Sequence, residues 1–496
     1  MSGNNNAKGW IITSAITVII IMLAAIFFYN NFFRQINGPL IETVPADAAF
    51  IVEINDNEQF VKTSASLMPY LVELFALDGL VGYESFLEKM PKKDSPIMVS
   101  GFVIDEKIVP LFSTRMEEHY FKKLLKLLQI DPRNNIKFEG YEIYSYGTHY
   151  KDFKFVFHNN VFSVSEDVEL LKKSIVQLKY PKGLTNDKSF KLVHKMVEKN
   201  VKQNWLLLNP ERYAEYLKSK VEEQNVGLID AWSGKSSWCA YQMRFSDIEM
   251  FLSGYMDTEK EEIQQFGSAV PEGEFPQRVV PISANALTVV DDANPKSLVQ
   301  YLDVNGLMNQ CQLNDYQRVS PVYMVFFSLP ADTCNYHYCA MKIDTTVASF
   351  ASFFRDERNV DSIQKNTPKA VYNCDVVLDA FSDPFSAIYA EDNYKCMMQV
   401  KDCYVLADTS TSLEYYKKVV KKSNYIETGN LFRFASANTP SDAVWSFTCF
   451  NQDDQLKKLM NKDYAKKSKL NDLKVFSISH TVPSQRLVGS NIYLKF

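Results

Sequence analysis

Hydrophobic residues follow three distinct patterns along this chain, and each pattern predicts a different kind of structure. Residues 10–29 form one predominantly apolar run that contains no charged side chain. Beyond residue 43, short segments replace this run, and their hydrophobic residues either alternate with polar ones or recur with helical spacing. A run of roughly 20 apolar residues can cross a bilayer as one helix, whereas alternation predicts strands and helical spacing predicts amphipathic helices.

The apolar run is best explained as an uncleaved transmembrane signal-anchor. Trp10 lies at one end and Tyr29 at the other, where amphipathic rings favour the membrane interface. The only small-residue sequence suited to signal-peptide cleavage lies inside the run itself, around Ala24. We therefore predict a cytoplasmic head at residues 1–9, a membrane helix at residues 10–33 and a linker at residues 34–43.

The charges around the run are nearly balanced, because Lys8 and the α-amino group precede it and Arg34 follows it. The rule that cytoplasmic flanks are positive therefore gives only a small bias. Because the head is too short to be a domain, we expect the bulk of the chain to lie in the periplasm, anchored in a bacterial inner membrane. A domain that faces the cytoplasm on the same anchor is the alternative.

The first part of the remaining chain predicts strands, helices and hairpins in a mixed order. A β-branched run at residues 50–54 predicts a strand, and the periodic stretch that begins at Asp56 predicts a helix. Two apolar runs on either side of Asp105-Glu106 predict a hairpin. Helical spacing follows at residues 121–130, and Asp131-Pro132 ends that helix because proline cannot continue it.

The clearest local signal is a hairpin that leads directly into a helix. Residues 153–158 and 161–165 are hydrophobic runs suited to strands, and Asn159 and Asn160 separate them. Asparagine tolerates the positive φ that a two-residue hairpin turn requires, so a tight turn is expected here. Ser165 and the acidic residues after it predict the start of a helix, and a pair of lysines lies in its later turns.

The same order of hairpin, cap and helix recurs in the second half of the chain. Residues 394–400 and 403–408 predict the hairpin, and residues 409–420 predict the helix. Three short runs correspond between the halves. They are Glu-Leu-Leu-Lys-Lys at 169–173 with Glu-Tyr-Tyr-Lys-Lys at 414–418, Val44-Pro45 with Val280-Pro281, and Asn204-Trp205 with Val444-Trp445.

This matched order predicts two tandem copies of one α+β unit. Hairpins dominate over alternating strands and helices, so we expect mainly antiparallel sheets with packed helices. The predicted domains are a first repeat at residues 44–267, a proline-containing linker at 268–279 and a second repeat at 280–496.

Composition limits the classes of function. The chain has 54 basic and 59 acidic residues and a net charge of −5, which argues against the basic footprint of a nucleic-acid-binding protein. All eight cysteines lie at or beyond Cys239, so an evenly spread disulfide framework is excluded. Local pairs, Cys334 with Cys339 or Cys396 with Cys403, and reduced buried thiols remain alternatives. The chain contains no asparagine glycosylation sequon, which favours a bacterial envelope protein.

One short motif resembles a known family. A single N-terminal span followed by the run VPADAAFIVEI at residues 44–54 is similar to bacterial, especially Bacteroidota, membrane-anchored extracytoplasmic proteins that share a domain of unknown function. The resemblance implies an envelope location. It implies no catalytic residue.

The six histidines predict no catalytic or metal site. His480 shares the parity of the apolar residues in its strand and is expected to be a core histidine. His158 closes a hairpin strand and His194 lies in a lysine-rich helix, and the sequence identifies a partner for neither. His337 lies between Cys334 and Cys339, but this spacing matches no common zinc pattern and a strand would point the ligands apart.

Other chemical signals are better explained by structure. Ser362 and Lys365 have Ser-x-x-Lys spacing without the companion motifs of that enzyme class. The acidic pairs Asp291-Asp292 and Asp453-Asp454 suit helix starts. Basic residues between 457 and 474 are interrupted by acidic ones and are expected on a solvated helix face. We therefore predict no catalytic residue, no cofactor and no metal.

Two classes of function compete. A duplicated, aromatic-rich chain without catalytic motifs predicts an interaction or accessory, chaperone-like protein of the cell envelope, associated with protein export or outer-membrane biogenesis. Its expected partners are the inner membrane, through residues 10–29, and envelope or translocation proteins, with no nucleic acid. The alternative is a carrier that holds a lipid or another apolar ligand in a cavity between sheet and helices. An enzyme with an unfamiliar site comes third.

Overall fold

The structure is a computed structural model, and the predicted membrane helix lies outside the residues that it describes. Within those residues, no helix combines the length and the apolar character needed to cross a membrane. The described residues are 39–75, 96–130, 135–147, 152–180, 183–198, 202–223, 226–234, 236–257, 279–291, 321–331, 335–343, 372–376, 394–400, 403–407, 409–422, 425–426, 429–441, 443, 445–450, 460–481 and 487–496.

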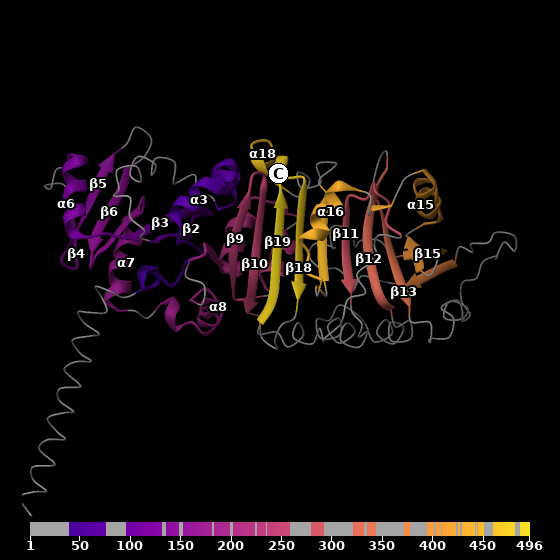
Figure 1. The fold of residues 1–496 in the computed structure, drawn as a ribbon, viewed down its shortest axis with the longest axis horizontal. Helices are drawn as coiled ribbons and strands as arrows, with labels where there is room; N and C mark the ends of the chain where they lie inside the picture. The colour runs from indigo at the N-terminus through magenta and orange to yellow at the C-terminus, as the bar shows by residue number, and fades with distance from the viewer. Residues whose placement is uncertain are drawn as a thin grey trace, which may run out of the picture.

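The described strands form one sheet of nineteen strands, and every pairing in it is antiparallel. Figure 1 shows this sheet along the long axis of the molecule, with β10 and β19 in the middle. Strands of the first half are β1 (Phe50–Ile54), β2 (Ile97–Ile104), β3 (Lys107–Arg115), β4 (Ile136–Phe138), β5 (Tyr141–Gly147), β6 (Asp152–His158), β7 (Val161–Ser165), β8 (Trp205–Leu208), β9 (Trp238–Ser246) and β10 (Glu249–Asp257). Strands of the second half are β11 (Ala286–Asp291), β12 (Pro321–Pro330), β13 (Asn335–Ile343), β14 (Tyr372–Val376), β15 (Tyr394–Val400), β16 (Cys403–Ala407), β17 (Trp445–Phe450), β18 (Val475–Thr481) and β19 (Leu487–Lys495).

The two halves of the sheet have the same strand order. The pairings give the order β5-β6-β7-β3-β2-β1-β8-β9-β10 in the first half, with β4 added outside β5. In the second half they give β14-β15-β16-β13-β12-β11-β17-β18-β19. Each strand of the second series therefore has a counterpart at the same place in the first.

The halves join through equivalent strands, because β10 pairs with β19. Ser253 and Asn491 occupy equivalent places in their hairpins, and they lie directly opposite each other at this junction. The junction is therefore locally two-fold symmetric, as in a dimer that pairs through one edge strand of each copy. The antiparallel strands predicted for the two repeats therefore belong to one continuous sheet, since hydrogen bonding continues across the middle.

Local sequence explains the turns and caps that lead from one element to the next. Asn159 and Asn160 have φ values of 48° and 60°, the positive values expected of a tight hairpin turn, and Asp105 and Glu106 adopt the same region between β2 and β3. The Asp167 carboxylate accepts hydrogen bonds from the first backbone N–H groups of the following helix. Asp167, two residues after Ser165, is thus the cap of that helix.

Helices cover both faces of the sheet. The cluster beneath α7 and α8 includes Trp238 and Ala240 of β9, and the cluster beneath α15 and α16 includes Phe251 and Tyr493. Strand register puts these four residues on one face, here called the α7/α15 face. Its described helices are η2 (Leu40–Thr43), α7 (Val168–Lys179), η6 (Leu184–Asn186), α8 (Lys188–Glu198), α15 (Ser410–Lys422) and α16 (Asn430–Ala437).

The opposite face carries a second set of helices over its own core. That core contains Phe50, Phe121, Phe155 and Phe496 among its buried residues. The helices in this region are α3 (Asn57–Ser64), η3 (Ala65–Leu67), α4 (Met68–Leu74), α6 (Glu118–Leu127), α9 (Pro210–Lys218), α10 (Val226–Ser233), α18 (Lys462–Ala465) and η11 (Lys469–Asp472). The architecture is α+β with a large antiparallel sheet, as the sequence predicts, whereas duplication of one unit stays a prediction.

Candidate functional site

A row of polar side chains crosses the middle of the sheet on the α7/α15 face. We call this set the central row; in spatial order it is Gln242, Ser253, Asn491, Ser479 and Ser446. Gln242, Ser253, Asn491 and Ser446 are half-buried, so no side chain covers them completely, whereas Ser479 is buried. The local two-fold of the sheet passes between Ser253 and Asn491. Strand centres facing a helical layer are usually apolar, which makes this open polar row a candidate for binding.

The neighbouring rows add charge and aromatic surface. The Arg244 guanidinium lies 4.3 Å from the centre of the Phe251 ring, an arrangement that favours a cation–π interaction. Lys495 and Tyr493 both donate to the Glu249 carboxylate, at 2.6 Å and 3.0 Å. Burial alone would raise the pKa of Glu249, but these hydrogen bonds and the Lys495 charge outweigh it and lower that pKa. A carboxylate held in this way is a positioning group rather than a general acid.

Two helices flank the central row, one from each half. On one side, Phe190 of α8 packs against Trp238 at a ring distance of 5.0 Å. On the other side, the Lys495 ammonium lies 3.5 Å from the centre of the Phe434 ring of α16. An open groove of about 420 Å³ lies where α8 meets β19, and its lining residues are Leu192, Lys195, Met196, Glu198 and Leu487.

On the opposite face, the start of η11 in the second half forms hydrogen bonds to α4 in the first half. The Glu73 carboxylate of α4 accepts from the Ser468 hydroxyl and from the backbone N–H of Lys469. Tyr70 stacks on Phe496 with ring centres 4.0 Å apart. These contacts join residues about four hundred positions apart, so the junction is fixed by side chains as well as by strand pairing.

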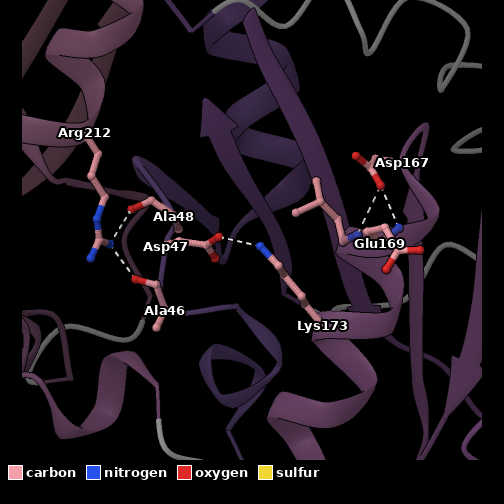
Figure 2. Close-up of polar contacts among 8 residues, drawn as sticks. Ala46, Asp47, Ala48, Asp167, Glu169, Lys173 and Arg212 are labelled. Atoms are coloured by element: carbon pink, nitrogen blue, oxygen red, sulfur yellow. Dashed lines mark hydrogen bonds and ion pairs between the residues drawn. The ribbon is translucent and has the colours of Figure 1, made fainter. Parts of the chain in front are cut away.

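The segment at residues 44–49 is held between helices of the first half, as Figure 2 shows. Arg212 of α9 donates to the carbonyl oxygens of Ala46 and Ala48. Lys173 of α7 pairs with Asp47 at 2.7 Å, but both side chains are about half exposed, so this ion pair contributes little stability. The motif that resembles the envelope family therefore serves to position the first strand.

His158 is buried beneath η2 and α7, and neither ring nitrogen has a hydrogen-bond partner. Burial, with a smaller contribution from the Arg115 charge, lowers the pKa of His158 to about 3. The side chain is 1% exposed. A neutral imidazole without access to solvent is a structural group, not a proton carrier.

Local packing also explains two other described histidines, His194 and His480. His194 stacks on Phe190 and lies 3.7 Å from the Glu53 carboxylate and 3.4 Å from that of Glu198. The sequence gives no sign of the Glu53 contact, because the two residues lie on different elements. His480 lies on the same face of β18 as Phe476 and Ile478, as its parity predicts, but it is half-buried rather than enclosed in the core.

The cysteines whose side chains the structure describes are buried and form no disulfide bond; they are Cys239, Cys339, Cys403 and Cys449. A bond between Cys396 and Cys403 is not formed, because the hairpin register places Cys396 opposite Ala407 and Cys403 opposite Val400. Burial raises the pKa of Cys239 to about 11 and that of Cys449 to about 12, so neither is a ready nucleophile.

Several sequence candidates cannot be placed. Cys334, Ser362, Lys365 and the pair Asp453-Asp454 lie outside the described residues, whereas Asp291 ends β11. Among the residues that the structure does describe, no group of three His, Cys, Asp or Glu side chains could hold a metal ion. The central row contains no residue type that sequence motifs single out, and only the junction of β10 with β19 brings its members together.

The fold and its central row define an extended antiparallel platform whose halves meet at equivalent strands. No protein-family model matches the chain, and no curated protein matches it. Among solved structures it is distantly similar to TP0453. Crystal form IV of that protein is 10% identical, with a TM-score of 0.25, over 44% of this chain and 80% of TP0453. Crystal form I is 8% identical, with a TM-score of 0.22, over 76% and 96% of the two chains.

Proposed function

We propose that this chain is a membrane-anchored interaction or accessory, chaperone-like protein of the bacterial cell envelope. In this proposal residues 10–29 hold it in the inner membrane, its bulk lies in the periplasm, and envelope or translocation proteins bind the central row. The observation that carries the proposal is the open polar row between α8 and α16. Binding by such a row requires surface and positioned hydrogen-bond groups, not an acid or a base.

The contacts that join the two halves support this role. The central row lies where both halves contribute, and the contacts of Glu73 and Tyr70 hold the halves together on the other face. A preorganised surface loses less conformational entropy when a partner binds. We further propose that the two halves arose by duplication of one unit, on the basis of their identical strand order.

The carrier alternative is less well supported. It requires the aromatic strands to line a cavity, but Phe153, Phe155 and Phe162 are fully buried in the core of the first half. Phe121 of α6 stacks on Phe157 with ring centres 4.8 Å apart. These side chains therefore pack against each other and against a helix, as in a core.

The test is gentle detergent purification of the full-length protein, followed by mass spectrometry of co-purifying proteins and lipids. The native chain is expected to retain envelope or translocation proteins at near-stoichiometric amounts. The double variant Ser253→Arg and Asn491→Arg should lose them, because two long charged side chains would stand in the central row.

The matched control is Gln59→Arg with Ala65→Arg, which adds the same charges at two exposed positions near the opposite face. This control should retain the partners. Equal retention by the central-row variant would contradict the assignment of the binding surface. A defined lipid at about one per chain, without any protein partner, would support the carrier instead.

A further inference from the structure

The helices of the α7/α15 face are much more basic than those of the opposite face. α7, α8, α15 and α16 together contain eleven basic and three acidic residues. α3, α4, α6 and α9 contain six basic and five acidic residues. The whole chain has a net charge of −5, so the excess of lysine on one face is a local feature.

Six lysines of this face remain available to a partner. Lys172, Lys173, Lys179 and Lys417 are neutralised by ion pairs with Glu169, Asp47, Glu139 and Glu414. The six are exposed and make no ion pair within the described part of the chain; they are Lys188, Lys191, Lys195, Lys418, Lys421 and Lys422. They come from α8 in one half and α15 in the other, so the charge spans both halves.

Exposed apolar side chains lie on the other two helices of this face, α7 and α16. Val176 of α7 is 39% exposed, Tyr180 follows α7 directly and is 58% exposed, and Phe434 of α16 is 43% exposed. Lysine together with exposed aromatic side chains is typical of surfaces that lie at the headgroup level of a membrane.

The chain enters the fold on this face. η2 begins at Leu40, and both Leu40 and Ile41 are buried in the core beneath α7. Only residues 34–39 separate it from the predicted membrane helix at residues 10–33, and six fully extended residues reach at most about 22 Å. The tether therefore holds the first described residues close to the membrane, on the side of the sheet that carries the free lysines.

We propose that the α7/α15 face lies against the anionic headgroups of the membrane that holds the predicted anchor. This inference rests on the membrane anchoring in the proposed function and adds which face is turned to the lipid. Charge complementarity favours an anionic lipid surface over a zwitterionic one. Because the central row lies on the same face, its partner is met at the membrane surface.

The test uses the full-length protein in nanodiscs of phosphatidylcholine, alone or mixed with phosphatidylglycerol. The rate of lysine acetylation is measured by mass spectrometry. In anionic discs we expect Lys188, Lys191, Lys195, Lys418, Lys421 and Lys422 to react at least about threefold more slowly. Salt at about 0.5 M should remove this protection, because it shortens the range of electrostatic attraction to a few ångström.

Internal controls are Lys123 and Lys126, which are exposed on α6 over the opposite face. Their rates should not depend on lipid charge. Equal rates in both kinds of disc at the six lysines, or slower reaction on α6 instead, would overturn the proposed orientation while leaving the anchor intact. A chain that does not enter the discs would contradict the anchor itself, and with it this inference.

Charge-reversal variants test whether the lysines themselves cause the protection from acetylation. Lys191→Glu with Lys421→Glu should abolish the protection of the neighbouring Lys188 and Lys422, since each helix then loses attraction for the lipid. Lys123→Glu with Lys126→Glu is the matched pair on α6 and should leave that protection unchanged. All four positions are exposed, so neither pair is expected to alter folding.

Discussion

The two halves of the sheet share a strand order but fill the space beneath their equivalent helices differently. At several equivalent buried positions in or beneath these helices, the first half has serine where the second half has a larger or more apolar side chain, and at one further position Leu111 stands where the second half has Tyr338. Strand register and helix caps define the pairs as Ser100 with Phe327, Leu111 with Tyr338, Ser113 with Ala340, Ser163 with Val405, and Ser174 with Tyr416.

The difference shows that one topology accepts two kinds of core. Phe327 stacks on Tyr338 at 5.1 Å, and the hydroxyl of Tyr338 donates to the Ser412 carbonyl. In the first half, the hydroxyls of Ser113 and Ser163 bond to each other at 3.1 Å. Strand order depends on hydrogen bonds between backbone groups, which almost any residue can form. Core packing requires that the volume is filled and that buried polar groups have hydrogen-bond partners, and both sets of side chains can meet these requirements.

Tyr416→Ala is expected to have the largest effect, because it empties the aromatic core of the second half. Tyr416 is 1% exposed, and its hydroxyl donates to the Val279 carbonyl at 2.7 Å. Loss of such a side chain should lower the free energy of unfolding by about 3–5 kcal/mol. Urea unfolding of the full-length protein in detergent measures it. Tyr416→Phe keeps the ring and should lower the unfolding free energy by only about 1 kcal/mol. If the two variants lost equal stability, packing of the ring would not be the cause of the loss.

Gly254→Ala tests the pairing of β9 with β10, the strand through which the first half meets the second. A Cβ at Gly254 would lie 1.8 Å from the carbonyl oxygen of Ala240, so the backbone of β9 or β10 would have to shift. The equivalent residue of β19 is Ile492, which shows that the close approach belongs to the first half alone. We expect a loss of about 1–3 kcal/mol in unfolding free energy. Ser253→Ala, the neighbouring control, should change it by less than about 0.5 kcal/mol.

His158→Leu makes a titratable core position of the first half apolar, like the equivalent Val400 of the second half. The comparison tests how this histidine affects stability at low pH. An unfolded histidine has a pKa of about 6.5, whereas the folded pKa of His158 is about 3. The unfolded state binds the proton first as pH falls, so the native protein loses stability from about pH 6.5 down to about pH 3. His158→Leu should remove this slope, at most about 1.4 kcal/mol per pH unit.

The measurement is the free energy of unfolding as a function of pH. His119→Gln, a substitution at an exposed position of α6, is the control. A His158→Leu profile as steep as that of the native protein would show that this histidine does not control the acid sensitivity of the first half.

Ser174→Ala has the smallest expected effect, and its sign is opposite to that of Tyr416→Ala at the equivalent position. The Ser174 hydroxyl is fully buried and has no hydrogen-bond partner. Removing it should raise the unfolding free energy by up to about 1 kcal/mol, because a buried unpaired hydroxyl is unfavourable. Thermal unfolding would detect the change as a small increase in Tm. A clear loss of stability would indicate an unrecognised polar role beneath α7.

The short runs of similar sequence in the two halves predict the shared order of strands and helices correctly. They do not align the two halves residue by residue as the structure does. The caps Asp167 and Thr409 are equivalent, so Glu169 and Glu414 stand three residues apart in the aligned helices. Trp205 lies opposite Glu53, whereas Trp445 lies opposite Val290, which is one residue out of step. A periodic pattern predicts an element, but its register is decided by which backbone groups meet across strands.

By itself, the sequence determined the local features of this protein: the apolar run, the turn at Asn159-Asn160, and the hairpin and helix units that make an α+β chain. These depend on neighbours within a few residues, where φ preferences, caps and side-chain periodicity act. Only the tertiary structure decided that β10 pairs with β19, that two sheets become one, and that Ser253 and Asn491 meet in an open polar row. Such contacts join residues more than two hundred positions apart, and their free energy comes from backbone pairing and packing that no local pattern encodes.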